Sequence, residues 1–179
     1  MKAMWLPLII ISAALTGCAV PKQQPKISLV SVFDKDQAER MMAEGTNSIK
    51  GSSLMRQVNG GVVSCAGQVV RLLPATPYAI ERMRFIYGSD TSGTVSAMSL
   101  QTNPEPFTNT DLDYQRIAKT TQCDTQGFFK FEKLSDGEFI VITRIFWKSN
   151  PNSAFYEGGG MMRKIKVQSG EVKEIVIAP

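Results

Sequence analysis

The sequence contains no histidine, the side chain that most often transfers protons or binds metal ions in proteins. Its absence excludes a Ser-His-Asp triad, a Cys-His nucleophile pair and the usual zinc sites. No phosphate-binding glycine motif or EF-hand spacing is present either. We therefore expect no catalytic residue, no cofactor and no metal ion. A hydrolase based on Ser, Lys or Asp is a minor alternative that no spacing supports.

The chain also lacks a dense run of basic residues. Its formal net charge is +4, and acidic residues are interleaved with the basic ones. Arg82 and Arg84 lie close together, as do Arg163, Lys164 and Lys166. A nucleic-acid-binding surface would need a basic stripe. We interpret these groups as solvated faces of a strand or helix and expect no nucleic-acid partner.

Long hydrophobic runs are missing as well. The apolar run Met4–Leu15 is shorter than the roughly 17 to 20 residues that span a bilayer. It follows a single cation, Lys2, and precedes the polar stretch Pro21–Lys26. A short positive region, a short apolar run and small residues are typical of a secretory signal peptide.

The signal ends in Leu15-Thr16-Gly17-Cys18, which resembles the lipobox of bacterial lipoproteins. The resemblance implies a signal peptide over residues 1–17, cleavage before Cys18, and a lipid anchor on the Cys18 sulfur. Two or more acyl chains, such as palmitate, anchor a protein stably. Ala19, where Asp would favour inner-membrane retention, indicates the outer membrane, on its periplasmic or surface side. An ordinary signal peptide and an uncleaved anchor are the alternatives.

Two cysteines remain, Cys65 and Cys123. Export places them in an oxidising compartment, where an even pair favours a disulfide. Closing that loop would stabilise the fold by about 4 kcal/mol on the chain-entropy model. Two free buried thiols are the alternative. A redox pair is disfavoured, because no Cys-x-x-Cys motif lowers either pKa.

The mature chain begins with two short segments. Residues 18–33 contain Pro21 and Pro25 and are interpreted as an extended, lipidated tether. Residues 34–45 are expected to form a short helix, with Asp34 or Asp36 as the cap and Gly45 just past its end.

From residue 46 to 179 the pattern changes to short strands separated by turn residues, which predicts an all-β sandwich. Pro77 starts a run with helical spacing that ends at Gly88, although a strand is the alternative there. An insertion at about 77–113 contains this helix and a polar stretch with one short expected strand, residues 94–100. Short strands are expected at 62–65 and 69–74. The clearest strands are expected in the C-terminal third: around Phe129 and Phe131, which alternate with Lys130 and Glu132, at 139–147, with apolar residues on both faces, and at 162–168 and 172–178.

The segment Cys123–Phe139 resembles the carboxypeptidase-regulatory-like pattern of transthyretin-like (prealbumin-like) domains, T-D-x-x-G-x-F-x-F-x-x-L-x-x-G-x-Y. Further likeness extends over residues 60–179, apart from the insertion. The resemblance implies a mainly β fold, a single seven-stranded β-sandwich with one or two short helices, and a non-catalytic module. Enzymes of this group hydrolyse hydroxyisourate with histidines and a C-terminal Tyr-Arg-Gly-Ser. This chain ends at Pro179 without either, so that activity is not carried over.

Trp147, Phe155 and Tyr156 lie in or beside the 147–160 segment, which we interpret as a flexible hairpin ending at Gly158-Gly159-Gly160. These aromatic side chains either pack into the core or contact a ligand or partner. Calcium binding by Asp111, Asp113 and Asp124 is disfavoured by their spacing. Asp124 is expected to hydrogen-bond its own turn.

The sequence therefore predicts an envelope lipoprotein, anchored at Cys18, that works through contacts with other envelope proteins. The alternative function is binding of a glycan or peptide through the 147–160 hairpin.

Overall fold

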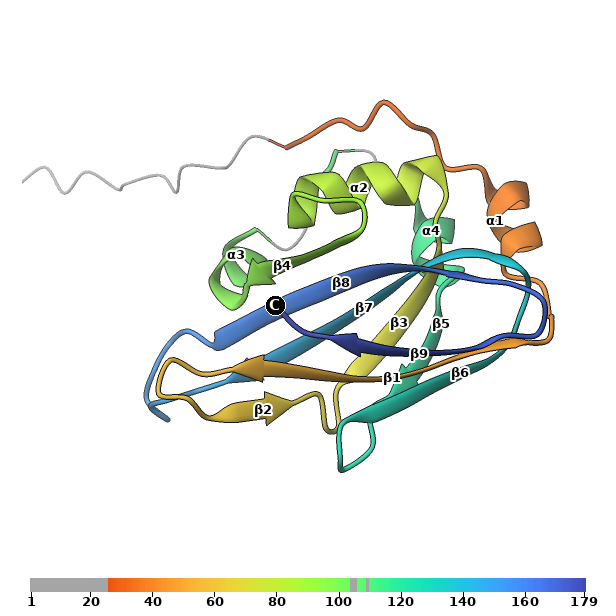
Figure 1. The fold of residues 1–179 in the computed structure, drawn as a ribbon. Helices are drawn as coiled ribbons and strands as arrows, with labels where there is room; N and C mark the ends of the chain where they lie inside the picture. Colours follow the sequence, from red (N-terminus) through yellow and green to blue (C-terminus); the bar gives the residue numbers. More distant parts are fainter. Residues whose placement is uncertain (1–25, 104–105, 109) are drawn as a thin grey trace, which may run out of the picture.

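The computed structural model describes residues 26–103, 106–108 and 110–179, which form a mainly β domain with two sheets (Figure 1). Within these residues the chain forms nine strands and four short helices, more than the seven strands and one or two helices expected. The strands are β1 Asn47–Arg56, β2 Val62–Ser64, β3 Val69–Pro74, β4 Ser92–Ser96, β5 Lys119–Gln122, β6 Phe128–Leu134, β7 Gly137–Trp147, β8 Glu157–Val167 and β9 Val172–Ile177. The helices are α1 Lys35–Met41, α2 Pro77–Tyr87, α3 Ala97–Thr102 and α4 Leu112–Arg116.

The smaller sheet is built around β1. β6 and β2 pair antiparallel with successive parts of β1, and β9 pairs parallel with it. β1 was not recognised as a strand because its inward positions include Gly51 and Ser53 rather than apolar side chains. A Cβ at Gly51 would lie 2.7 Å from the Ile175 side chain, so glycine is needed for this close packing.

The larger sheet has the antiparallel order β4-β8-β7-β3-β5. β7 lies at its centre, with apolar residues buried on both faces, as expected for residues 139–147. Inward residues such as Phe139 and Val141 meet the smaller sheet, and Ile140 faces the helices. The two sheets thus enclose one apolar cluster, and the helices cover a second on the outer face of the five-stranded sheet (Figure 1).

Helix α2 lies across this outer face and has strong end signals. Thr76 accepts a hydrogen bond from the Ala79 amide, Pro77 occupies the first turn, and Gly88 ends the helix at φ +70°. The helical prediction is confirmed and the strand alternative is wrong. The strand expected at 94–100 is also wrong beyond Ser96, because Ser96 caps α3 by accepting from the Ser99 amide.

Gly158–Gly160 does not form a flexible hairpin. These residues belong to β8, which pairs with β7 on one side and β4 on the other. A Cβ on Gly159 would collide with the Val95 carbonyl of β4, so the glycines allow the strands to approach closely. The loop between β7 and β8 covers only residues 148–156.

The end of the expected tether lies on the domain. Ile27 donates from its amide to the Pro106 carbonyl at 2.7 Å, and Leu29 and Phe33 are buried against the helical cluster. The carboxylate of Glu81 on α2 accepts from the amides of Val30 and Ser31. The segment 27–33 is therefore part of the folded unit and not a free spacer.

Candidate functional site

A groove opens on the outer face of the five-stranded sheet, bordered by β3, β7, α2 and α4. Its volume is about 650 Å³, within the range of about 300–1,000 Å³ that is usual for small-ligand sites. Arginine, aromatic, aliphatic, amide and hydroxyl side chains line it, and no lining residue that the structure describes carries a carboxylate. We call it the arginine groove; its lining residues are Gly67, Gln68, Val69, Arg71, Leu73, Arg82, Met83, Ile86, Tyr87, Leu100, Tyr114, Gln115, Ile142, Thr143, Arg144 and Phe146.

Two neighbouring strands place Arg71 and Arg144 in this groove. Arg71 on β3 lies opposite Ile142 on β7, and Arg144 follows two positions later on the same face. Arg71 donates from Nη2 to the Gln115 carbonyl at 3.0 Å. Neither residue was singled out from the sequence. One sequence signal could have identified them: each of these two largely apolar strands contains a single arginine.

Arg82 is buried, not solvated as expected from its polar neighbours. Its guanidinium carbon lies 4.2 Å from the ring centroid of Phe107, 4.9 Å from that of Tyr114 and 5.6 Å from that of Tyr78. Aromatic faces attract a cation at these distances, and they attract it more strongly away from water. Arg82 thus adds a fixed positive charge to the wall of the groove. Arg84, two residues later along the helix, is exposed at the surface and pairs with Asp90.

Two tyrosines beside these arginines are kept neutral. Burial raises the pKa of Tyr87 to about 12, against an opposing effect of Arg144. Burial likewise raises the pKa of Tyr114 to about 12, against the effects of Arg82 and Arg71. Desolvation disfavours the charged phenolate. Both tyrosines are neutral at ordinary pH, and the raised pKa values keep a compensating phenolate out of the groove even in the alkaline range around pH 10.

One end of the groove continues into an aromatic surface. Phe146 lines the groove, and its ring lies 6.1 Å from that of Tyr156. Lys148 lies over the Tyr156 ring at 5.0 Å. Tyr156 is 45% exposed, so part of its ring is accessible to a ligand that extends out of the groove.

The other two aromatic residues singled out from the sequence do not join this surface. Trp147 alternates with Phe146 along β7 and packs partly against the core between the sheets, on the opposite face. Its indole nitrogen donates to Glu157 at 3.0 Å. Phe155 is 50% exposed in the β7–β8 loop and does not line the groove. Of the three, only Tyr156 is placed next to the groove.

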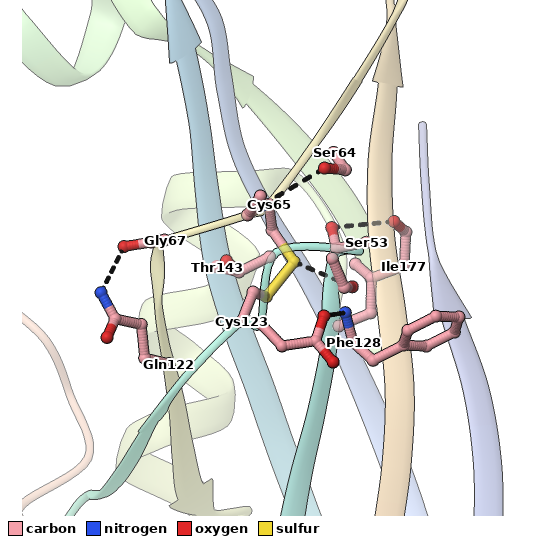
Figure 2. Close-up of a disulfide and its surroundings, with 12 residues drawn as sticks. Ser53, Ser64, Cys65, Gly67, Gln122, Cys123, Phe128, Thr143 and Ile177 are labelled. Atoms are coloured by element: carbon pink, nitrogen blue, oxygen red, sulfur yellow. Dashed lines mark hydrogen bonds between the residues drawn. A yellow bond between two sulfur atoms is a disulfide. The ribbon is translucent and has the colours of Figure 1, made fainter.

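The predicted Cys65–Cys123 disulfide is present, with the Cα atoms 5.8 Å apart (Figure 2). It links the segment before β3 to the segment after β5. Gly67 donates from its amide to the Cys123 carbonyl, and the Gln122 side chain donates to the Gly67 carbonyl at 2.7 Å. The Cys123 amide donates to the Gln68 carbonyl. Because Gly67 and Gln68 line the groove, the disulfide holds one of its rims.

The acidic residues considered for calcium have local structural roles. Asp124 accepts from the amides of Gln126 and Phe128, as predicted for its turn. Asp111 caps α4, and Asp113 pairs with Lys35 at 3.3 Å. The residues described contain no group of three or more Cys, Asp or Glu side chains able to hold a metal ion.

A second hollow, of about 700 Å³, lies on the outer face of the four-stranded sheet. Its lining includes Lys50, Lys130, Glu174, Phe128 and Val176, so it carries charges of both signs. Phe128 and Val176 are each about half exposed. This surface suits a protein contact better than a small charged ligand.

Cys18 lies outside the described residues. In the part of the chain that the structure covers, the helices are too short and too polar to cross a bilayer.

The chain is similar in fold to a known structure, although no family model or curated protein matches it. Among solved structures, a candidate carbohydrate-binding protein from Pseudomonas aeruginosa is similar, with a TM-score of 0.67 and 17% sequence identity. The alignment covers 82% of this chain and 97% of that chain. At this identity the similarity shows a shared two-sheet fold.

Proposed function

We propose that this chain is a non-enzymatic envelope lipoprotein whose β-sandwich binds carbohydrate in the arginine groove. The observation that carries the proposal is the groove itself, an aromatic and hydrogen-bonding cleft of ligand size on a rigid sheet. Phe146 and Tyr156 offer apolar faces at one end, and arginine, amide and hydroxyl groups offer hydrogen bonds inside. The name of the similar Pseudomonas aeruginosa protein favours the same ligand class.

This proposal keeps the glycan-binding alternative from the sequence but moves its site. The 147–160 segment contributes Tyr156, whereas the principal residues come from β3 and β7. The transthyretin-like type of the sandwich is part of the proposal. Its support is that Cys123–Phe139 includes the Gly127 turn at φ +86° and inward-facing Phe129 and Phe131.

A glycan array tests the binding, with the protein purified from membranes in detergent. We expect the wild type to bind a defined set of saccharides and Phe146→Ala to lose that binding. Phe128→Ala is the matched control, because Phe128 is equally aromatic but lies on the other sheet. Absence of saccharide binding by the wild type would refute the function. Equal loss in both variants would refute the site.

The anchor at Cys18 is proposed from the lipobox, and Ala19 favours the outer membrane. The disulfide supports export to an oxidising compartment. Fractionation of cells that produce Cys18→Ser tests the lipid: acylation should disappear from Cys18, and stable membrane attachment should be lost. A Cys18→Ser protein that stays as firmly bound as the wild type would contradict the lipoprotein assignment.

Protein–protein contact within the envelope is the second candidate function. The exposed apolar side chains Phe128, Val172 and Val176 on the four-stranded sheet favour it. Crosslinking of the lipidated protein in cells, followed by a pulldown, should recover a defined partner that Phe128→Asp loses. Recovery of free monomer only would argue against this function.

A further inference from the structure

We propose that the ligand of the arginine groove is an anionic saccharide, whose acidic group is bound by Arg144 and Arg71. This inference rests on the proposed carbohydrate function and names the ligand class. The bound group is a carboxylate, sulfate or phosphate carried on a sugar, and the sugar extends toward Phe146 and Tyr156.

The charge of the groove is local and of one sign. Three arginines line it, while its described lining residues include neither Asp nor Glu. The whole chain carries a formal charge of only +4, so this concentration does not follow from composition. A cleft lined by one charge with low-dielectric walls raises the local concentration of the opposite ion.

Arg144 is available for a ligand. Its side chain is exposed, and it has no hydrogen-bond or ion-pair partner within the described ranges. A guanidinium has several donors and no acceptor. Its planar fork matches carboxylate, sulfate or phosphate oxygens in a bidentate arrangement better than the hydroxyls of a neutral sugar.

Arg71 supplies a second donor nearby. Its Nε is buried and meets no acceptor in the described part of the chain, although its Nη2 is used by the Gln115 carbonyl. A buried donor without an acceptor is unfavourable, and a ligand oxygen would supply the missing hydrogen bond. Arg71 and Arg144 occupy diagonal positions on paired strands, about 7–8 Å apart in such an arrangement, and long side chains from there can converge on one acidic group.

The surroundings add no negative charge to oppose this ligand. Tyr87 and Tyr114 are neutral at ordinary pH, as a tyrosine with a pKa of about 10 already is, and burial raises the pKa of each further, to about 12. The apolar face of Phe146 and the exposed ring of Tyr156 lie next to the arginines, so the site offers more than a binding position for a simple anion.

Isothermal titration of the detergent-purified protein tests the proposal with matched ligands. The probes are an oligogalacturonate and its neutral methyl ester, a sulfated and an unsulfated disaccharide, and a sugar phosphate and its parent sugar. Inorganic sulfate and phosphate alone are the simple-anion controls. We expect at least one acidic saccharide to bind at least about tenfold more tightly than its neutral form, and to weaken as salt is raised.

Three variants locate the effect. Arg144→Gln should reduce the acidic preference by at least about tenfold, and Arg144→Lys should retain part of it. Arg71→Gln should also weaken binding of the acidic form. Lys166→Gln removes one positive charge from an exposed site outside the groove and should change little. Near-ultraviolet circular dichroism checks that each variant is folded.

The outcomes separate this inference from the proposed function. Equal binding of acidic and neutral forms would overturn the anionic ligand but leave carbohydrate binding intact. Binding of simple anions as tightly as acidic saccharides would overturn the saccharide assignment. An acidic preference that survives both arginine-to-glutamine changes would place the anion elsewhere. Failure of every saccharide to bind would refute the proposed function together with this inference.

Discussion

The hydroxyl of Tyr87 is directed from the end of α2 toward β8, where a Cβ on Gly160 would lie 3.3 Å from it. Burial raises the pKa of this hydroxyl, and the nearby Arg144 only partly opposes that shift. The pKa of Tyr87 therefore reflects two opposing features of the groove, the burial of this side chain and the positive charge of Arg144. The sequence gives no indication of either, because Tyr87 has the same spacing as any core aromatic residue.

At the residue scale we predict a pH-dependent contribution of Tyr87 to stability. Its pKa is about 12 in the folded protein and about 10 when unfolded. The folded state therefore holds the proton more tightly. The free energy of unfolding should fall as pH rises from about 10 to about 12, by up to about 2–3 kcal/mol for this residue. Urea unfolding across that range should show a shallower decline for Tyr87→Phe. Identical profiles would contradict the assigned burial.

The buried environment of Arg82 could not be predicted from the sequence. In sequence Arg82 stands between Glu81 and Met83, two residues before a second arginine, a pattern typical of a solvated helix face. Its burial depends on Phe107 and Tyr114, which come from other segments brought against α2 by the fold. Only the tertiary structure brings these rings around the guanidinium.

At the element scale, the docked segment 27–33 depends on a few contacts. Proline and polar residues suggested an extended spacer, but the run from Ile27 onward supplies Leu29 and Phe33 to the helical cluster. Glu81 holds the intervening backbone with two amide hydrogen bonds. Hydrogen bonds from Ser31 and Val30 lower the pKa of Glu81, so this attachment is strongest above the ordinary carboxyl range and weakens as pH falls through it.

We predict that Glu81→Gln loosens this segment without unfolding the sheets. The neutral amide is a weaker acceptor than a carboxylate and cannot receive both backbone amides equally well. Hydrogen exchange should show faster exchange at Val30 and Ser31, while β7 is unchanged. Glu174→Gln is the control, because that exposed residue lies on the opposite sheet. Unchanged exchange at Val30 and Ser31 would show that Glu81 does not hold the segment.

At the scale of the whole molecule, alternation and turn residues were enough to predict a mainly β fold and its clearest strands. β7 and β6 were readable because apolar residues mark their inward positions. β1 and the glycine-rich start of β8 were not, because close packing between strands requires small residues where a strand pattern normally shows large ones. The groove was missed because arginines from β3 and β7 meet only after the sheet forms.

The disulfide should matter to the whole fold and to one rim of the groove. On the chain-entropy model, removing a bridge with a sequence separation of 58 lowers the free energy of unfolding by about 4 kcal/mol. We expect the double variant Cys65→Ala/Cys123→Ala to unfold at markedly lower urea than the wild type. Reduction of the wild type should produce the same shift. Unchanged midpoints would show that the bridge contributes little.

The double variant should also bind saccharide more weakly while still folded, because Gly67 and Gln68 lose part of the support for their position. Saccharide titration under conditions in which the double variant remains folded measures this loss of affinity. Wild-type affinity in the folded double variant would show that the disulfide does not support the groove.

Amide chemical-shift mapping of the protein with a saccharide that it binds shows where the ligand lies. Changes should be concentrated at Gly67–Leu73, at Ile142–Phe146 and at the C-terminal end of α2, which together border the arginine groove. Changes centred instead on Phe128 and Val176, across the four-stranded sheet, would contradict the proposed site.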